Sequence, residues 1–235
     1  MGDARDQGKE TARPLHVCVE GTKGAGKTTT IAAVRSSLEA EGWAVSLSAV
    51  FHEGNAWAVS QGFAGGVPMI EAGAAENRAM VDWLRARMRA VRDDFFAQHS
   101  GSGRPAVLIS DRGWITLHAY LYEGRWAEEP GALAAIDACW EEVLREAPPT
   151  FFVHTRPEVT LRRRAGQLDA VSGLQTDARV SHDYERRMNL ARVHRDRITG
   201  MWETTEGPFV DLAPRVILAL RAGASHPLTP APFPR

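Results

Sequence analysis

The stretch that decides the fold is LHVCVEGTKGAGKTT, which occupies residues 15–29. It opens with a largely apolar run typical of a buried strand, and residues 21–28 then match the phosphate-binding pattern G-x-x-x-x-G-K-[ST]. Glycines in such a loop permit positive φ angles and close backbone approach, so successive N–H groups can surround phosphate oxygens. Residues 29–41 carry apolar side chains at helical spacing, which predicts a helix whose N-terminus faces the same anion.

The first ligand that this loop predicts is a nucleoside triphosphate, ATP with Mg²⁺. In the motif, Lys27 reaches the β- and γ-phosphates and the Thr28 hydroxyl ligates the metal. A glycine turn that merely joins a strand to a helix is disfavoured, because strand, loop, Lys-Thr pair and helix follow in the order that the chemistry requires. We assign nucleotide binding to the whole loop: Gly21, Thr22, Lys23, Gly24, Ala25, Gly26, Lys27, Thr28 and Thr29.

Composition limits the class of protein. A chain of 235 residues, 44% of them hydrophobic, suits a single α/β domain. The 28 basic and 29 acidic residues nearly cancel, which gives no electrostatic reason to expect a nucleic-acid partner. The two cysteines, Cys18 and Cys139, are too few for a disulfide framework and are expected to be buried thiols of a cytoplasmic protein. No apolar run approaches the roughly 18 residues of a membrane span, so no membrane partner is expected.

The ends of the chain differ from its middle. Residues 1–13 are polar and charged with no apolar core of a signal peptide, and we expect a flexible arm. Residues 222–235 contain four prolines, which predicts an extended tail. The domain itself is expected to span residues 14–221.

Apolar runs and helical periodicities alternate along this domain. Strands are predicted at residues 15–19, 44–51, 106–110, 150–154 and 209–212, with an irregular loop from Gly54 to Pro68. Helices are predicted at residues 29–41, 71–98, 114–122, 133–145 and 181–202, with another opening at Pro157. This order indicates an α/β fold: a parallel sheet of about five strands with helices on both faces.

Ligands of such sheets bind where the strands end, so the residues that follow each strand are the candidates for chemistry. Asp111 can hold Mg²⁺ or accept a proton, and Arg112 can clamp a phosphate; a helix cap with a surface ion pair is the alternative. Glu53 is a candidate general base or acceptor-orienting group, and equally a solvated loop glutamate.

Two groups of arginines could serve phosphate chemistry. The run at residues 162–164, followed by a polar stretch, suggests a mobile lid over about residues 162–177, whereas the alternative is a solvated helix face. The long helix carries Arg87 apart from a shared face of three further arginines, and an ordinary charged face is the alternative for each: Arg85, Arg89 and Arg92.

These motifs together resemble the thymidylate kinase family of P-loop nucleoside monophosphate kinases, over roughly residues 15–210. EGTKGAGKTT at residues 20–29 looks like the family's EGxxGAGKTT, and Asp111-Arg112 with Thr116 and Ala119-Tyr120 looks like DRxxxSxxAYQ. LRARMRAV at 84–91 is similar to the helix whose arginine holds the acceptor phosphate, RAGQLD at 164–169 to the lid segment RxxxLD, and FHEG at 51–54 lies where the family has TREP.

The resemblance implies a P-loop kinase fold with a small lid, a homodimer and use of ATP with Mg²⁺. It implies that Lys27, Asp111, Arg112, Glu53 and the lid residue Arg164 serve catalysis. Thr28 and Asp111 would serve the metal, and the acceptor would contact five residues: Glu53, Arg87, Arg112, Thr116 and Tyr120.

The departures from the family pattern fall on the acceptor side. Lys23 occupies a loop position where the family usually has an acid near the deoxyribose, which suggests a different sugar contact or an extra anionic group on the acceptor. His52 and Gly54 replace the arginine and proline of TREP, and Leu121 replaces the glutamine after the AY pair. ATP is therefore better supported than thymidylate.

Three functions are compatible with the sequence. The first is ATP- and Mg²⁺-dependent phosphoryl transfer to a nucleoside monophosphate. The second is a kinase of nucleosides or specialised nucleoside-like metabolites with Glu53 as base on a 5′-hydroxyl, because Glu53 with Trp57 is similar to the EPVxxW of deoxynucleoside kinases. The third is a regulatory P-loop NTPase, which the lack of N-K-x-D and of D-x-x-G after the third strand disfavours.

Overall fold

Five strands form one parallel sheet in the order β2-β3-β1-β4-β5. In this computed structural model the described residues are 13–63, 68–164, 177–204 and 212–225. The central strand β1 places Val17 beside Ile109 of β3 and Val19 beside Phe151 of β4. The predicted α/β fold with a parallel sheet is confirmed, and its strands are β1 (Leu15–Gly21), β2 (Ala44–Ser48), β3 (Ala106–Asp111), β4 (Thr150–His154) and β5 (Ile198–Glu203).

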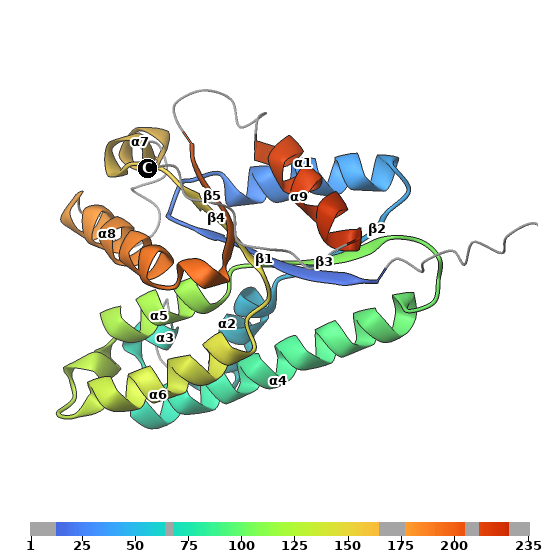
Figure 1. Cartoon of the computed structure of the whole chain (residues 1–235). Coiled ribbons are helices and arrows are strands. Elements are labelled where there is room, and N and C mark those ends of the chain that lie inside the picture. Colours follow the sequence, from blue (N-terminus) through green and yellow to red (C-terminus); the bar gives the residue numbers. More distant parts are fainter. Residues whose placement is uncertain (1–12, 64–67, 165–176, 205–211, 226–235) are drawn as a thin grey trace, which may run out of the picture.

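Helices cover both faces of this sheet (Figure 1). Helices α1 and α9 lie together on one face, and α2, α4, α5, α6 and α8 cover the other. The strands β1, β3 and β4 are apolar along most of their length because helices bury them from both sides. The helices are α1 (Lys27–Ala40), α2 (Val50–Ser60), α3 (Pro68–Glu71), α4 (Ala74–His99), α5 (Trp114–Glu123), η1 (Arg125–Glu128), α6 (Ala132–Arg145), α7 (Pro157–Arg164), α8 (Asp177–Val193), η2 (Arg195–Arg197) and α9 (Leu212–Ser225).

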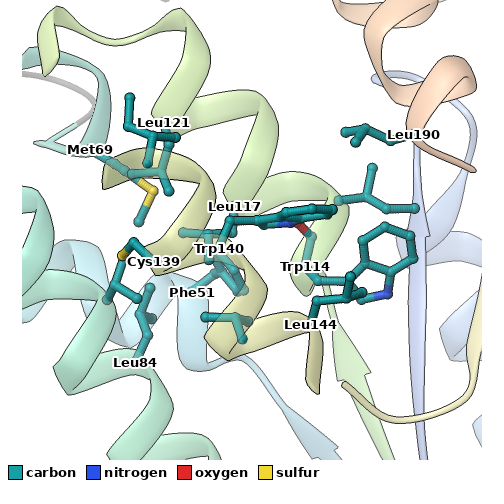
Figure 2. Packing of buried hydrophobic residues seen from close by; sticks show 14 of the residues in the cluster. Phe51, Met69, Leu84, Trp114, Leu117, Leu121, Cys139, Trp140, Leu144 and Leu190 are labelled. Atoms are coloured by element: carbon teal, nitrogen blue, oxygen red, sulfur yellow. The ribbon is translucent and has the colours of Figure 1, made fainter. Parts of the chain in front are cut away.

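The larger hydrophobic core joins α5 to its neighbours. Figure 2 shows side chains from α2, α3, α4, α5, α6 and α8 meeting in one cluster. Two tryptophans bury their rings there and still satisfy their polar atoms: Trp140 Nε1 donates to the Trp114 carbonyl at 3.0 Å, and Trp114 Nε1 donates to Thr150 Oγ1 at 3.0 Å. These bonds join α6 to α5 and α5 to β4, so α5 has a defined position over the sheet.

The predicted second strand and the loop after it are wrong in part. Strand β2 ends at Ser48, and residues 50–60 form α2 instead of a strand end and an irregular loop. The buried positions Val50, Gly54 and Ala58 recur at helical spacing. A Cβ on Gly54 would meet Leu84 Cδ2 at 2.8 Å, so this glycine permits close packing of α2 on α4. Glu53 therefore stands in the first turn of a helix.

The helix predicted at residues 181–202 is wrong in its last part, and the strand predicted at residues 209–212 is wrong at Leu212. Helix α8 ends at Val193, and residues 198–202 of the expected helix belong to the edge strand β5. Leu212 begins α9, which continues through Ser225 into the expected extended tail, whereas residues 209–211 lie outside the described residues. A hydrophobic spacing that fits a helix does not reveal that β4 offers an open edge for pairing, which is what selects the strand.

The remaining expectations about segments concern residues that the structure leaves undescribed. Residues 1–12, 226–235 and most of the expected lid, 165–176, lie outside the described residues. Within the described residues, no helix combines the length and the apolar character needed to cross a bilayer.

The core of α5 can be tested by a matched pair of leucine variants. Leu117 is fully buried, whereas Leu133 on α6 is 53% exposed. Leu117→Ala is expected to lower the free energy of unfolding by about 2–5 kcal/mol, because it leaves a cavity among packed helices. Leu133→Ala should change it by less than about 0.5 kcal/mol in the same urea titration. Equal losses in the two variants would contradict this packing.

Candidate active site

The phosphate-binding loop lies between β1 and α1 in a conformation that needs glycine. Gly21, Gly24 and Gly26 have φ angles of 150°, 71° and 82°. A Cβ on Gly21 would stand 1.7 Å from the Val153 carbonyl oxygen of β4, and one on Gly24 would stand 3.1 Å from Thr160 of α7. The glycines therefore serve both the backbone turn and the close approach of neighbouring elements.

Helix α7 orients the peptide groups of this loop. Thr160 Oγ1 donates to the Lys23 carbonyl at 2.8 Å, and Arg163 Nη1 donates to the Gly24 carbonyl at 3.0 Å. In a trans peptide the N–H points opposite to its carbonyl, so the next two N–H groups point away from α7. The second of them, on Ala25, makes only a long 3.4 Å contact with the Thr22 carbonyl inside the loop. This arrangement presents N–H groups to an anion.

Lys27 lies across the loop. Its Nζ donates to the carbonyls of Gly21 and Thr22 at 3.1 and 2.9 Å. Burial, together with the positive charges of Arg187 and Arg112, lowers the Lys27 pKa to about 8. An ammonium held among cations gains most from a polyanion, so this position suits a triphosphate.

Thr28 and Asp111 face one hollow. They line a cavity of about 400 Å³ between α1 and the ends of β2 and β3. Asp111 Oδ1 is buried there and has no hydrogen-bond partner within the described residues. A threonine hydroxyl and a carboxylate with a vacant oxygen are a donor set that fits Mg²⁺, which takes few protein ligands and completes its shell with phosphate and water oxygens.

A fully buried carboxylate connects β1 to α5. Glu20 Oε1 accepts hydrogen bonds from the N–H groups of Gly113, Ile115 and Thr116 at 2.6, 3.0 and 3.0 Å. Its Oε2 accepts from the Thr116 hydroxyl at 2.7 Å. Glu20 therefore caps α5, where a negative charge is also favoured by the helix dipole. A Cβ on Gly113 would come within 2.8 Å of Cys18 Sγ, so glycine is required for this approach.

Helix α8 joins the same network through Arg187. Its Nη1 donates to Thr116 Oγ1 at 3.0 Å and its Nε donates to Asp183 Oδ1 at 2.7 Å. Asp183 and Glu20 raise the Arg187 pKa, although burial opposes the shift. Thr116 was predicted to contact the acceptor, but its hydroxyl is buried between Glu20 and Arg187. In this structure Thr116 joins protein groups to one another.

Arg112 stands between β3 and α5 in a strained conformation. Its φ of 77° makes it the one non-glycine residue with positive φ in the described part of the chain. The guanidinium donates to the Tyr120 hydroxyl at 2.7 Å, and its Nε is buried with no described partner. A fixed guanidinium with unused hydrogen-bonding capacity, next to the phosphate loop, can bind a phosphate.

The two predicted acceptor residues on α2 and α4 bind each other. Arg87 Nε donates to Glu53 Oε2 at 2.7 Å, and both side chains are almost half exposed. Other arginines of α4 have different partners: Arg85 and Arg89 bind Glu146, the residue that follows α6, and Arg85 also binds Glu142 of α6. They therefore fasten α4 to α6, and Arg87 is separated from them as its helical position predicts.

A second cavity, of about 300 Å³, opens beside the loop between α5 and α8. Lys23 and Tyr120 line it, whereas Glu53 and Arg87, which were predicted with Tyr120 to contact the acceptor, are not among its described lining residues. Sequence reasoning missed its remaining charged walls on α5 and α8, because charges on a helix suggest a solvated face. These walls are Glu123, Asp183, Arg186 and Arg187.

The structure thus gathers most of the predicted donor-side residues around one loop. Lys27, Thr28, Asp111 and Arg112 lie at its rim. Thr29 follows Thr28 in α1 and is exposed. Arg164 ends α7, and its side chain falls outside the described part of the chain. The sequence motif includes Glu20 but predicts no role for it. Its position directly before the phosphate loop was the one sequence feature that could have indicated a role.

Comparison with known proteins agrees with this geometry. No family model and no curated protein matches the sequence. The crystal structure of thymidylate kinase from Ehrlichia chaffeensis superposes with a TM-score of 0.53 at 14% identity, covering 89% of this chain and 99% of that one. The fold is that of the P-loop kinases. At this identity the likeness concerns the fold alone.

A second P-loop kinase structure aligns over a similar length. Shikimate kinase from Acinetobacter baumannii, in complex with shikimate, gives a TM-score of 0.49 at 17% identity, covering 92% of this chain and 97% of that one.

The Glu20 network makes a prediction about stability. Glu20→Gln replaces one carboxylate oxygen by an amide that cannot accept the Thr116 proton, while Arg187 already donates to the same hydroxyl. We expect the free energy of unfolding to fall by about 1–3 kcal/mol. Glu39→Gln, which removes an exposed ion pair with Arg35, should cost less than about 1 kcal/mol. Urea titrations measure both, and an unchanged Glu20→Gln midpoint would refute the proposed cap.

Proposed function

We propose that this protein is an ATP- and Mg²⁺-dependent kinase that transfers a phosphoryl group to a small-molecule acceptor, a nucleoside monophosphate or a closely similar metabolite. The observation that carries the proposal is the conformation of the loop. The Lys27 side chain lies across it, and α7 donates hydrogen bonds to two of its carbonyls, so that the N–H groups of those peptides point away from α7. The residues that would meet the metal, Thr28 and Asp111, share one hollow at its edge. The P-loop kinase fold supports this assignment.

Each donor-side residue has a defined task in this proposal. The loop N–H groups and Lys27 bind the β- and γ-phosphates, and Arg112 clamps an oxygen of the transferring group or the acceptor phosphate. Thr28 and Asp111 would hold Mg²⁺, which neutralises charge on the phosphates when it is bound. The chain needs to supply little covalent chemistry, because positioning and charge stabilisation account for most of phosphoryl transfer.

The acceptor-side assignments are less direct, because Glu53 and Arg87 are paired. Arg87 would have to leave Glu53 to bind an acceptor phosphate, and Glu53 would have to leave Arg87 to take a proton from a nucleoside hydroxyl. The pair is exposed and therefore weak, so either exchange is inexpensive. The Glu53–Arg87 pair therefore favours neither a nucleoside monophosphate nor a nucleoside as the acceptor.

A transfer screen tests the proposal. Purified protein with Mg²⁺ and γ-labelled ATP is incubated with nucleosides, nucleoside monophosphates and other hydroxylated or phosphorylated metabolites. We expect label on one acceptor class. Lys27→Ala should retain the fold and lower the transfer rate by about 10²–10³-fold, because it removes one preorganised positive charge that stabilises the transition state. Arg221→Ala, on α9 and ion-paired with Glu41, is the control.

Two results would sink the kinase proposal. One is Lys27→Ala activity equal to that of the control variant. The other is ATP hydrolysis that no acceptor changes, which would indicate the regulatory NTPase instead.

The pH dependence of ATP use follows from Lys27. Its pKa is lowered to about 8, so the free enzyme loses this positive charge as the pH rises through that value. The kcat/KM for ATP is expected to decline above pH about 8, since this ratio reports ionisations of the free enzyme. Lys27→Arg should lack the decline even if it is slower, because a guanidinium stays protonated. Parallel profiles for the two proteins would show that another group causes it.

A further inference from the structure

The cavity between α5 and α8 is built from charged and aromatic walls. Its volume of about 300 Å³ lies at the lower end of the range for small-molecule sites. Lys23 enters from the phosphate loop, Tyr120 and Glu123 come from α5, and Arg186 comes from α8. The cavity therefore joins the loop that would hold the phosphoryl donor to two helices that are rigidly connected through the Glu20 network.

The two adjacent arginines of α8 differ in their electrostatic surroundings. Arg187 is 6% exposed and its charge is matched by Asp183 at 2.7 Å. Arg186 is 20% exposed, and the nearest carboxylate in the described part of the chain, that of Glu123, is 3.9 Å away, beyond hydrogen-bonding distance. The charge of Arg187 is thus satisfied within the protein, and that of Arg186 is compensated less closely.

An imidazole, a backbone carbonyl and an aromatic ring surround Arg186. Its Nη2 lies 3.0 Å from His182 Nε2, its Nη1 lies 3.5 Å from the Ala119 carbonyl, and its guanidinium stands 5.8 Å from the centre of the Tyr122 ring. A guanidinium that is oriented by a ring and a carbonyl, with its nearest described carboxylate at 3.9 Å, can still bind an oxyanion. Lys23 adds a second cation to the same cavity.

Two acids also line the cavity, Glu123 from α5 and Asp183 from α8. Burial raises the pKa of Glu123, and the nearby charge of Asp183 raises it as well. A hydroxyl or ammonium donor from a ligand would give Glu123 a hydrogen-bond partner, whereas Asp183 already has Arg187. The cavity is thus suited to a ligand that carries an oxyanion and a hydrogen-bond donor close together.

We propose that this cavity is the acceptor site and that it takes a compact metabolite whose phosphate or carboxylate binds Arg186 and Lys23 while a hydroxyl or ammonium group binds Glu123. The inference rests on the proposed function, because this protein has an acceptor only if it is a kinase. It assigns recognition of the acceptor anion to α8 instead of to Arg87. It also gives the unusual Lys23 of the loop a ligand.

Binding measurements test the site without requiring turnover. The full chain is saturated with Mg²⁺ and a non-hydrolysable ATP analogue, so that the phosphate loop is filled, and titrated calorimetrically with thymidine 5′-monophosphate, ribose 5-phosphate and quinate. The first two probes represent phosphates and the third a hydroxylated carboxylate. We expect at least one probe to bind, and Arg186→Gln to weaken that binding by about tenfold or more, the loss of one charge-assisted contact.

Two further variants, one at Arg186 and one elsewhere on α8, show whether the loss of binding is specific to the Arg186 guanidinium. Arg186→Lys keeps the charge without the planar fork and should lose less affinity than Arg186→Gln. Arg192→Gln, an exposed position of the same helix, should bind like the wild type. Failure of all three probes to bind, or equal affinities of Arg186→Gln and Arg192→Gln, would overturn the inference.

The transfer assay separates this inference from the function on which it rests. An active wild type whose acceptor KM is unchanged by Arg186→Gln would refute the site and leave the kinase intact. A wild type that binds a probe through Arg186 and transfers no phosphoryl group would refute the kinase and leave the binding site intact.

Discussion

The Glu20 carboxylate is the interaction on which the candidate site depends. Moving an ionised carboxylate into the interior is costly unless the protein replaces its water with fixed donors. Three backbone N–H groups and the Thr116 hydroxyl do so, and Arg187 supplies a positive charge behind Thr116. Because these partners belong to α5 and α8, the end of β1, the segment after β3 and helix α8 are held in one geometry. The phosphate loop begins one residue after Glu20, so it inherits that geometry.

Local signals were sufficient for the parts of the fold whose environment is uniform. Strands β1, β3 and β4 are buried on both faces and are almost continuously apolar, so their limits can be predicted closely. The edge elements were not predictable in the same way. Val50 and Phe51 extend the apolar run of β2, yet their side chains pack in the core with α4, where the missing side chain of Gly54 admits Leu84. Strand β5 depends on the free edge of β4, a tertiary feature that helical spacing conceals.

The candidate site divides along the same line. Lys27, Thr28, Asp111 and Arg112 lie at strand ends or in a motif with fixed spacing, and topology alone brings them together. Glu123, Arg186 and Arg187 lie on helices, where a charge pattern does not distinguish a cavity wall from a solvated face. Glu53 and Arg87 illustrate a different limit of sequence analysis. Both were predicted to contact the acceptor, but the sequence could not show that these opposite charges on neighbouring helices would pair with each other.

This division has a physical consequence for specificity. In the proposed kinase, donor binding relies on backbone N–H groups and on glycines at positive φ, and at Gly21 the Val153 carbonyl occupies the space that a side chain would need. The walls of the α5–α8 cavity are side chains on helices whose positions are set separately, through Glu20 and Thr116. A change of side chain at Lys23, Glu123 or Arg186 alters charge in that cavity and keeps the hydrogen bond that orients the loop at residue 23, since α7 holds the Lys23 backbone carbonyl there. Under the proposed function, the chain can therefore depart from the thymidylate kinase pattern on its acceptor side while its donor side stays intact.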